Sequence, residues 1–195
     1  MHFTFFSRLL DKKNFENFLD ETNKFIISEL LKNGRIKLTE LAKKLKVTPA
    51  AVKERVDRLI KKKVITISAL INPESLYPLS ACIGVEADAD GVNLIVRKLR
   101  NCPLVFHLAK TSGNHNLIIN MVARDIAQLE EFLNKQIRSE PGIRHVEVNI
   151  SNSIIVPKYL PLRFFYPYDP EYAPCGLRFD DEERCPSCPA FEKKK

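Results

Sequence analysis

The chain has 195 residues, of which 45% are hydrophobic and 28% charged, and its formal net charge is +7. This composition fits an ordinary globular protein of one large or two small domains, and the absence of a run of 18 apolar residues argues against a transmembrane helix. The N-terminus lacks a long apolar h-region and a small-residue cleavage site, so we expect a cytoplasmic protein without a membrane partner. Five cysteines in an unsecreted chain argue against a disulfide scaffold.

The first helices are predicted from apolar spacing and capping residues. Residues 1–19 form an aromatic N-terminal extension, whose later part suits an amphipathic helix packed on the following helix or on a partner subunit. Asp20 is expected to cap the next helix, and Gly34 to follow its end. The core stripe of that helix is predicted to be Phe25, Ile26, Leu30 and Leu31.

Leu38 to Lys63 reads as two short helices joined by a tight turn. Thr48 stands where an N-cap belongs, and Pro49 follows at the first helical position, where its missing N–H costs nothing. The predicted core residues are Leu38, Leu41, Ala42 and Leu45 in the first helix and Val52, Val56, Leu59 and Ile60 in the second. This pattern is typical of a helix-turn-helix, here in a domain spanning residues 20–66.

Basic charge is concentrated on this segment. Residues 32–63 contain twelve Lys or Arg and three acidic residues, a net charge of 12 − 3 = +9 in a chain whose total is +7. Such a local excess indicates a nucleic-acid-binding surface, although a lysine-rich solvated surface is the alternative. The residues predicted to contact DNA are Lys43, Lys44, Lys46, Thr48, Ala50, Ala51, Lys53, Arg55, Arg58 and Lys61.

These residues are expected to make two kinds of DNA contact, to phosphates and to bases. The lysines and arginines neutralise phosphates, whereas Thr48, Ala50, Ala51 and Lys53 occupy the N-terminal half of the second helix, which reads bases, with Arg55 as a further candidate for base reading. Small alanines permit contact with thymine methyl groups, but they also simply favour helix. Arg58 either clamps phosphate or pairs with Glu54, four residues before it.

A linker and a second domain follow. Asn72-Pro73 and Tyr77-Pro78 interrupt an extended stretch, which predicts a linker over residues 67–80. From residue 81 the hydrophobic period changes to two, with strands expected at 81–89, 105–112, 115–123 and 143–156 and helices at 91–100 and after Asp125. The order βαββαβ predicts a ferredoxin-like domain over residues 81–157, so the fold class is α+β, with a winged-helix-like DNA-binding domain in front.

The two domains together resemble the Lrp/AsnC (feast/famine) transcriptional regulators of bacteria and archaea, and an archaeal source is expected. The residues that carry the resemblance are Leu19-Asp20, Asn33-Gly34-Arg35, Glu40-Leu41-Ala42, Thr48-Pro49 and Arg55-Val56-x-Arg58-Leu59, followed by the βαββαβ domain. The resemblance implies a sequence-specific regulator that binds double-stranded DNA as a homodimer or a higher even-numbered homo-oligomer. It also implies a small effector, commonly an amino acid, bound between the ferredoxin-like domains.

The loop expected to line the effector site departs from the family pattern. Gly113, Asn114, His115 and Asn116 stand where the family often has Gly-Asp-x-Asp. The lost carboxylates remove the obvious partner for a ligand ammonium group. A further departure is Ile60 and Lys63, which replace the usual Glu and Gly after the recognition helix. His107, His115 and His145 lack metal-ligand spacing along the sequence and are interpreted as strand or loop residues, with a functional role open for His115.

Residues 158–195 form a proline- and aromatic-rich tail that contains Cys175, Cys185 and Cys188. Cys185 and Cys188 form a CxxC, so the tail offers three soft ligands for zinc or an iron–sulfur cluster. Both need four ligands as a rule, and the fourth is expected from elsewhere in the subunit, from a partner or from solvent. A reversible thiol–disulfide pair and unligated thiols are the alternatives.

No catalytic motif is present, so we expect a regulator rather than an enzyme. Siroheme-decarboxylase-like enzymes share the two-domain plan and are one alternative, although the strongly cationic second helix argues against it. A DNA-architectural protein with little sequence preference is the other alternative.

Overall fold

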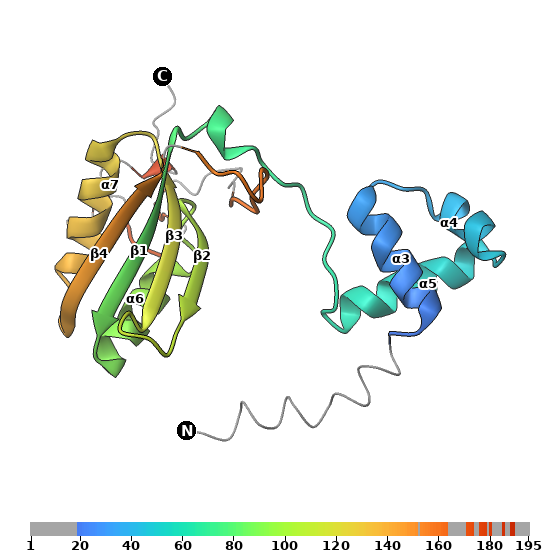
Figure 1. Cartoon of the computed structure of the whole chain (residues 1–195), viewed down its shortest axis with the longest axis horizontal. Coiled ribbons are helices and arrows are strands. Elements are labelled where there is room, and N and C mark those ends of the chain that lie inside the picture. Colours follow the sequence, from blue (N-terminus) through green and yellow to red (C-terminus); the bar gives the residue numbers. More distant parts are fainter. Residues whose placement is uncertain are drawn as a thin grey trace. The chain divides into compact units, whose positions relative to one another are not determined.

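The computed structural model describes residues 19–151, 153–163, 171–173, 176–178, 180, 185, 188 and 189. The predicted N-terminal extension therefore lies almost wholly outside the described residues. The chain divides after Ser68 into two compact units, one helical and one built on a sheet (Figure 1). Within the described residues, no helix is both long and apolar enough to cross a membrane.

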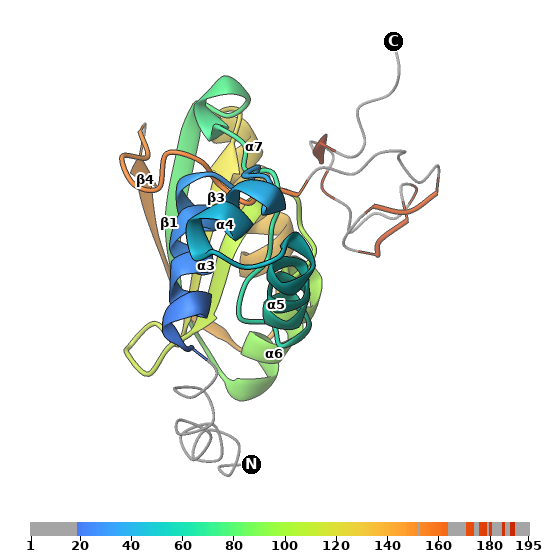
Figure 2. The same ribbon diagram turned by 90° about the vertical axis from the view of Figure 1, so that its right-hand side faces the viewer.

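The helical unit consists of α3 (Glu21–Lys32), α4 (Leu38–Leu45) and α5 (Pro49–Lys61). Helix α4 contacts both α3 and α5, and the three can be followed in Figure 2. Their shared core consists of six buried side chains, Ile26, Leu41, Ala42, Val52, Val56 and Leu59. The helix-turn-helix prediction is confirmed, and residues 19–68 contain no strand that would form a wing.

Capping residues set the helix boundaries as predicted. The carboxylate of Asp20 accepts a hydrogen bond from the Asn23 N–H at 2.7 Å, and the Thr48 hydroxyl accepts one from the Ala51 N–H at 3.2 Å. Between α4 and α5, Lys46 adopts a left-handed conformation (φ 56°), which closes the tight turn. Gly34 does follow the end of α3, but the cap residue Asn33 is extended and Gly34 has no positive φ.

Two predicted core positions of the helical unit are wrong. Leu31 is 83% exposed and Ile60 is 42% exposed. Each lies next to a better-buried neighbour at the end of its helix, and a unit of three short helices buries only a narrow stripe of each one.

The second unit is a four-stranded antiparallel sheet of β1 (Leu79–Ala87), β2 (Val105–Lys110), β3 (Leu117–Ala123) and β4 (Ile143–Ser151). The spatial order is β2-β3-β1-β4, which is the order of a ferredoxin-like βαββαβ unit and confirms the prediction. The last strand ends at Ser151, earlier than its apolar sequence suggested.

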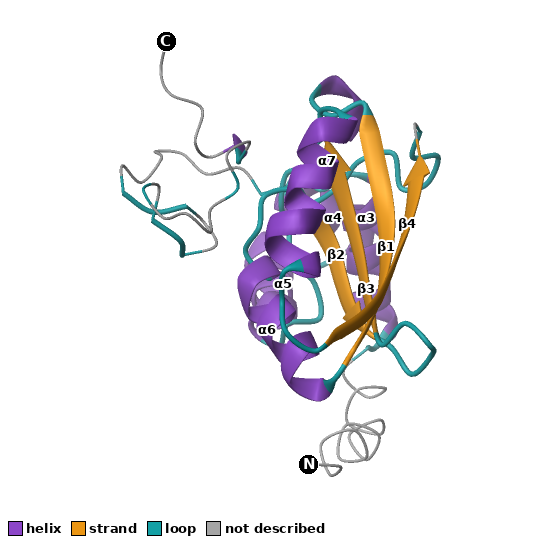
Figure 3. Cartoon of the chain, turned by 90° about the vertical axis from the view of Figure 1, so that its left-hand side faces the viewer, coloured by secondary structure: helices purple, strands orange, loops and turns teal. Residues whose placement is uncertain are grey.

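Helices α6 (Ala89–Leu99) and α7 (Ile126–Leu133) cover one face of the sheet (Figure 3). A π-helical turn, Asn134–Arg138, extends α7. The core between helices and sheet has nineteen buried residues, with Phe132, Ile83 and Ile95 among the largest. Asp125 caps α7 as predicted, because its carboxylate accepts the Gln128 N–H at 2.7 Å.

The predicted linker differs from the structure. The second unit begins at Ala69, and its first residues include a short 3-10 helix, Pro73–Ser75. Ile71 exchanges two backbone hydrogen bonds with Leu160, at 2.9 and 2.8 Å, so the segment before β1 pairs with the segment after β4. Because of this pairing, most of residues 67–80 belong to the sheet unit.

Candidate nucleic-acid interface

The N-terminal half of α5 presents an exposed surface on a fixed support. Thr48, Ala50, Ala51 and Lys53 are exposed, whereas Val52 between them is fully buried in the helical core. The buried side chain orients the helix, and the exposed ones form an open ridge of three small uncharged residues and one cation, Lys53. This is the part of a helix-turn-helix that enters the major groove.

Four of the cations predicted to bind DNA are exposed and make no ion pair within the described residues. They are Lys43, Lys46, Lys53 and Lys61. Lys62 and Lys63 share this property. The positive charge of these side chains is therefore uncompensated on their own unit and is available to phosphates.

Lys44, also predicted to bind DNA, forms ion pairs with acidic residues of the helical unit. Its Nζ lies 2.6 Å from the carboxylate of Glu29 and 3.2 Å from that of Glu40. Hydrogen bonds from Lys32 and Lys44 lower the pKa of Glu29 to about 2. These contacts join α4 to α3 on the surface of the unit.

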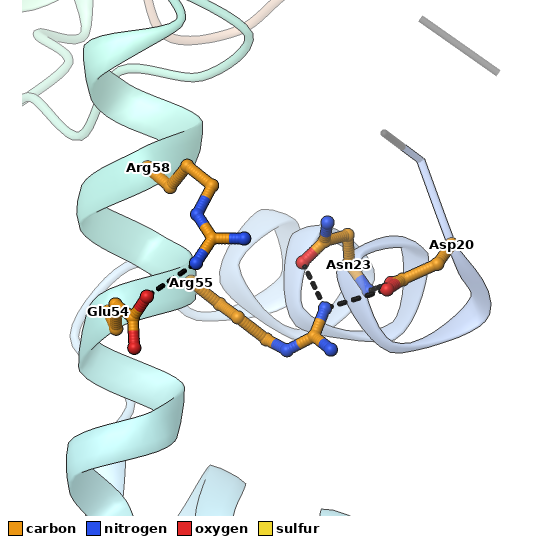
Figure 4. A network of polar contacts seen from close by, with 5 residues as sticks. All are labelled: Asp20, Asn23, Glu54, Arg55 and Arg58. Atoms are coloured by element: carbon orange, nitrogen blue, oxygen red, sulfur yellow. Dashed lines mark hydrogen bonds and ion pairs between the residues drawn. The ribbon is translucent and has the colours of Figure 1, made fainter. Parts of the chain in front are cut away.

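Arg55 and Arg58 are also paired within the unit (Figure 4). Arg55 Nη1 donates to Asp20 Oδ2 at 2.7 Å and to Asn23 Oδ1 at 3.1 Å, which ties α5 to the first turn of α3. The hydrogen bond from Arg55, together with that from the Asn23 N–H, lowers the pKa of Asp20. Arg58 lies 2.5 Å from Glu54, the alternative partner predicted from their spacing of four residues. Sequence reasoning missed the contact between Arg55 and Asp20, because 35 positions separate the two residues.

In the loop predicted to line an effector site, Asn116 has a structural role. Its side-chain amide accepts the Ala87 N–H at 3.2 Å and donates to the Ala87 carbonyl at 2.6 Å, so it pairs with the end of β1 as another strand would. The Thr111 N–H donates to the Asn116 carbonyl at 3.1 Å and closes the hairpin. Gly113 and Asn114, at the tip, are exposed.

His115 turns back over the sheet. Its ring stacks on that of His145, with centroids 5.8 Å apart and an interplanar angle of 16°. A Cβ on Gly84 would lie 2.6 Å from the His115 ring, so the glycine makes room for it. His115, His145 and Glu147 each place one potential ligand atom within 4.8 Å of the others. The sequence spacing of the histidines gave no sign of this cluster, because strand pairing brings them together; His107 is not part of it.

A cavity of about 380 Å³ lies elsewhere in the sheet unit, along β2 and α6. Its lining includes Arg100, His107, Lys110 and Arg163 beside apolar side chains such as Phe106. With three cationic side chains, this cavity suits an anionic small molecule.

The described tail cysteines lie at a second, much smaller cavity. Cys185 and Cys188 line it together with Cys102, which stands between α6 and β2. Cys175, the third predicted ligand, lies outside the described residues. The sequence analysis did not group Cys102 with the tail cysteines, because the two segments are far apart along the chain.

Comparisons with known proteins agree with both units. The AsnC-type helix-turn-helix domain matches residues 19–60, and the Lrp/AsnC ligand binding domain matches residues 80–160. An uncharacterized HTH-type transcriptional regulator of Pyrococcus abyssi is 33% identical over 138 residues, which cover 70% of this chain and 87% of that protein. The chain belongs to the Lrp/AsnC family of transcriptional regulators.

Other members of the Lrp/AsnC family support this assignment. HTH-type transcriptional regulator LrpA of Pyrococcus horikoshii is 32% identical over 66% of this chain and 92% of its own length. The solved structure of E. coli AsnC superposes with a TM-score of 0.64 at 25% identity, covering 71% of this chain and 95% of that one. The protein is thus a DNA-binding regulator with a ligand-binding domain, and these relatives favour that reading over the siroheme-decarboxylase-like alternative.

Proposed function

We propose that this Lrp/AsnC regulator recognises specific operators by placing the N-terminal half of α5 in the major groove. The observation that carries the proposal is the row of exposed Thr48, Ala50, Ala51 and Lys53 held by the buried Val52. Lys43, Lys46 and Lys61, exposed and without ion pairs in the described residues, bind the flanking phosphates.

The cations that are paired within the helical unit have a different role in this proposal. Arg55 holds α5 on α3, so it positions the recognition helix rather than reading bases. Lys44 and Arg58 must exchange a carboxylate partner for phosphate if they contact DNA, which lowers their net contribution. Lys53 therefore stands as the strongest candidate for a base contact.

The test begins with selection of an operator from random double-stranded DNA by the full chain. Lys53→Ala should weaken operator binding by about 1–3 kcal/mol, measured by fluorescence anisotropy over a series of salt concentrations. Arg97→Ala, which removes an exposed cation from α6 in the sheet unit, should leave affinity unchanged. Unchanged operator affinity in Lys53→Ala/Arg58→Ala would contradict the placement.

The same titrations separate a specific regulator from an architectural protein. A regulator binds its operator about 10³-fold or more tightly than unrelated DNA at fixed salt. A ratio near one, together with equal losses on both DNAs in Lys53→Ala, would support the architectural alternative instead.

We further propose that the protein acts as a homodimer or a higher even-numbered assembly. A two-fold dimer presents two α5 helices to half-sites about 34 Å apart, so the selected operator should be an inverted repeat. Analytical ultracentrifugation of the full chain gives the assembly state. A monomer bound to a single half-site would contradict this proposal.

The ligand-binding domain leads us to propose a small-molecule effector, commonly an amino acid in the wider family. Two places compete for it: the loop of Gly113, Asn114, His115 and Asn116, and the cavity lined by Arg100 and Lys110. Calorimetric titration with amino acids and small carboxylates identifies the ligand. Loss of its binding in His115→Ala, with retention in Arg100→Ala, would support the loop; the reverse would support the cavity.

A further inference from the structure

Three cysteines that are far apart in the sequence line one small cavity of the sheet unit. Cys102 follows α6, whereas Cys185 and Cys188 belong to the tail. The cavity measures about 30 Å³, which is room for one ion or one water molecule. Its remaining walls include Leu99, Pro103, Leu104, Ala173 and Pro189.

Backbone hydrogen bonds fix the position of each cysteine. The Cys102 N–H donates to the Leu99 carbonyl at 2.9 Å, and the Val105 N–H donates to the Cys102 carbonyl at 3.2 Å. In the tail, the Cys188 N–H donates to the Cys185 carbonyl at 3.0 Å. A CxxC pair together with further cysteines is a common ligand arrangement of structural zinc sites.

The described residues of the tail make other contacts with the sheet unit: Leu162 packs against its core, and Arg163 Nη1 donates to Asn101 Oδ1 at 2.8 Å. Among its described residues after Leu160, Ala173 is the one buried hydrophobic side chain. Cys185 itself packs against the core of the sheet unit. A metal ion held by the three cysteines would add a cross-link between this segment and the sheet unit.

We propose that Cys102, Cys185 and Cys188 bind a zinc ion, which fastens the tail to the start of β2. Each thiol loses its proton to solvent and coordinates the ion as a thiolate, so no redox partner is needed. Cys175, predicted as a ligand from the sequence, lies outside the described residues, and the proposal rests on the other three. The site is independent of DNA binding by α5.

A second possible metal position sharpens the test. The cluster of His115, His145 and Glu147 offers nitrogen and oxygen ligands on the same unit. A bound ion would therefore have two places to go. Thiolate and imidazole ligands give different spectra, so the two are separable by experiment as well as by mutation.

The experiment measures metal content in the full chain purified without chelator. We expect about one zinc ion per chain, retained in His145→Ala and in Cys82→Ser, which removes an exposed thiol on β1 that does not line the cavity. Cys102→Ser and Cys188→Ser should each lose most of the zinc. Loss of zinc in His145→Ala but not in Cys102→Ser would overturn the proposal.

If the variants fail to fold, the proposal can still be tested by a measurement on the unmutated chain. Zinc is removed with a chelator under reducing conditions and replaced by Co²⁺, whose thiolate charge-transfer band in the near ultraviolet should appear and saturate at about one ion per chain. Proteolysis of the tail should become faster in the zinc-free protein. Absence of the band, iron in place of zinc, or a disulfide between Cys102 and a tail cysteine in the purified protein would overturn the proposal.

Discussion

The helical unit and the sheet unit are stabilised in different ways. The helical unit has six buried core residues, whereas the sheet unit has nineteen. The helical unit adds polar contacts to its small core: Arg55 with Asp20 and Asn23, and Lys44 with Glu29, join its helices on the surface. The sheet unit also has polar contacts, such as the ion pair of Lys98 with Glu140, but burial of its larger hydrophobic core is the main source of its stability.

This difference shows how a DNA-binding unit reconciles stability with cationic charge. Some of its basic side chains, Arg55 and Lys44, pair with acidic residues of the α3 segment. Others, such as Lys43, Lys46 and Lys53, are exposed and make no ion pair within the described residues, and these are the cations that we propose bind DNA phosphates. The sheet unit requires no such division, because residues 69–195 contain 15 basic and 16 acidic side chains.

The largest expected effect comes from the cores. Phe132→Ala should lower the stability of the sheet unit by about 3–5 kcal/mol, because Phe132 is 1% exposed and leaves a cavity. Leu41→Ala should instead destabilise the helical unit, whose core contains Leu41. Differential scanning calorimetry should show two transitions, each shifted by one variant; a single transition shifted by both would contradict separate stabilisation.

A smaller effect is expected at the turn before β4. Gly142 has φ +81°, and a Cβ there would lie 2.5 Å from the carboxylate of Asp88, the N-cap of α6. Gly142→Ala should therefore cost the sheet unit about 1–3 kcal/mol. Gly113→Ala is the matched control, since nothing lies within 4 Å of its added Cβ. Equal melting temperatures of the two variants would contradict the strain.

Two arginines of α5 offer a finer comparison within the helical unit. Arg55→Ala should cost about 1 kcal/mol, because it removes the link to Asp20 and Asn23. Arg58→Ala should cost less than about 0.5 kcal/mol, since its partner Glu54 lies on the same exposed helix surface. Chemical denaturation followed by circular dichroism measures both. The same loss in both variants would show that Arg55 is an ordinary surface pair.

The weakest expected effect is a dependence on pH. The folded-state pKa of Glu29 is about 2, below its usual value of 4.5, so its contribution to stability is complete above about pH 4.5 and is lost as pH falls toward 2. Glu29→Gln should flatten the decline of the melting temperature of the helical unit in this range. Asp20, whose pKa is also lowered, should leave part of the decline in place. An unchanged profile in Glu29→Gln would contradict the role of Glu29.

Local signals explain what the sequence could predict. Each correct cap, at Asp20, Thr48 and Asp125, depends on a side chain that accepts an N–H three residues later. The alternation of apolar residues in the sequence, Ala81, Ile83, Val85 and Ala87, likewise predicted β1, and all four are buried in the core. Helix spacing alone could not show which apolar residues of a three-helix unit remain exposed, and Leu31 and Ile60 were therefore misplaced.

The site residues depend more on contacts between distant segments. Strand pairing brings His145 and Glu147 beside Gly84 and His115, and folding of the tail brings Cys185 near Cys102. Neither contact has a period or spacing that a single sequence reveals. The exposed ridge of α5 was predictable because one helix carries all of it.

The amide of Asn116 has a mechanical consequence. It joins the β2–β3 loop, just before β3, to Ala87 by two hydrogen bonds, and the residue after Ala87, Asp88, caps α6. A molecule that pulled the hairpin away would break both bonds and strain the start of α6. Displacement of the hairpin should therefore disturb the N-terminus of α6, because the two adjacent residues Ala87 and Asp88 connect them.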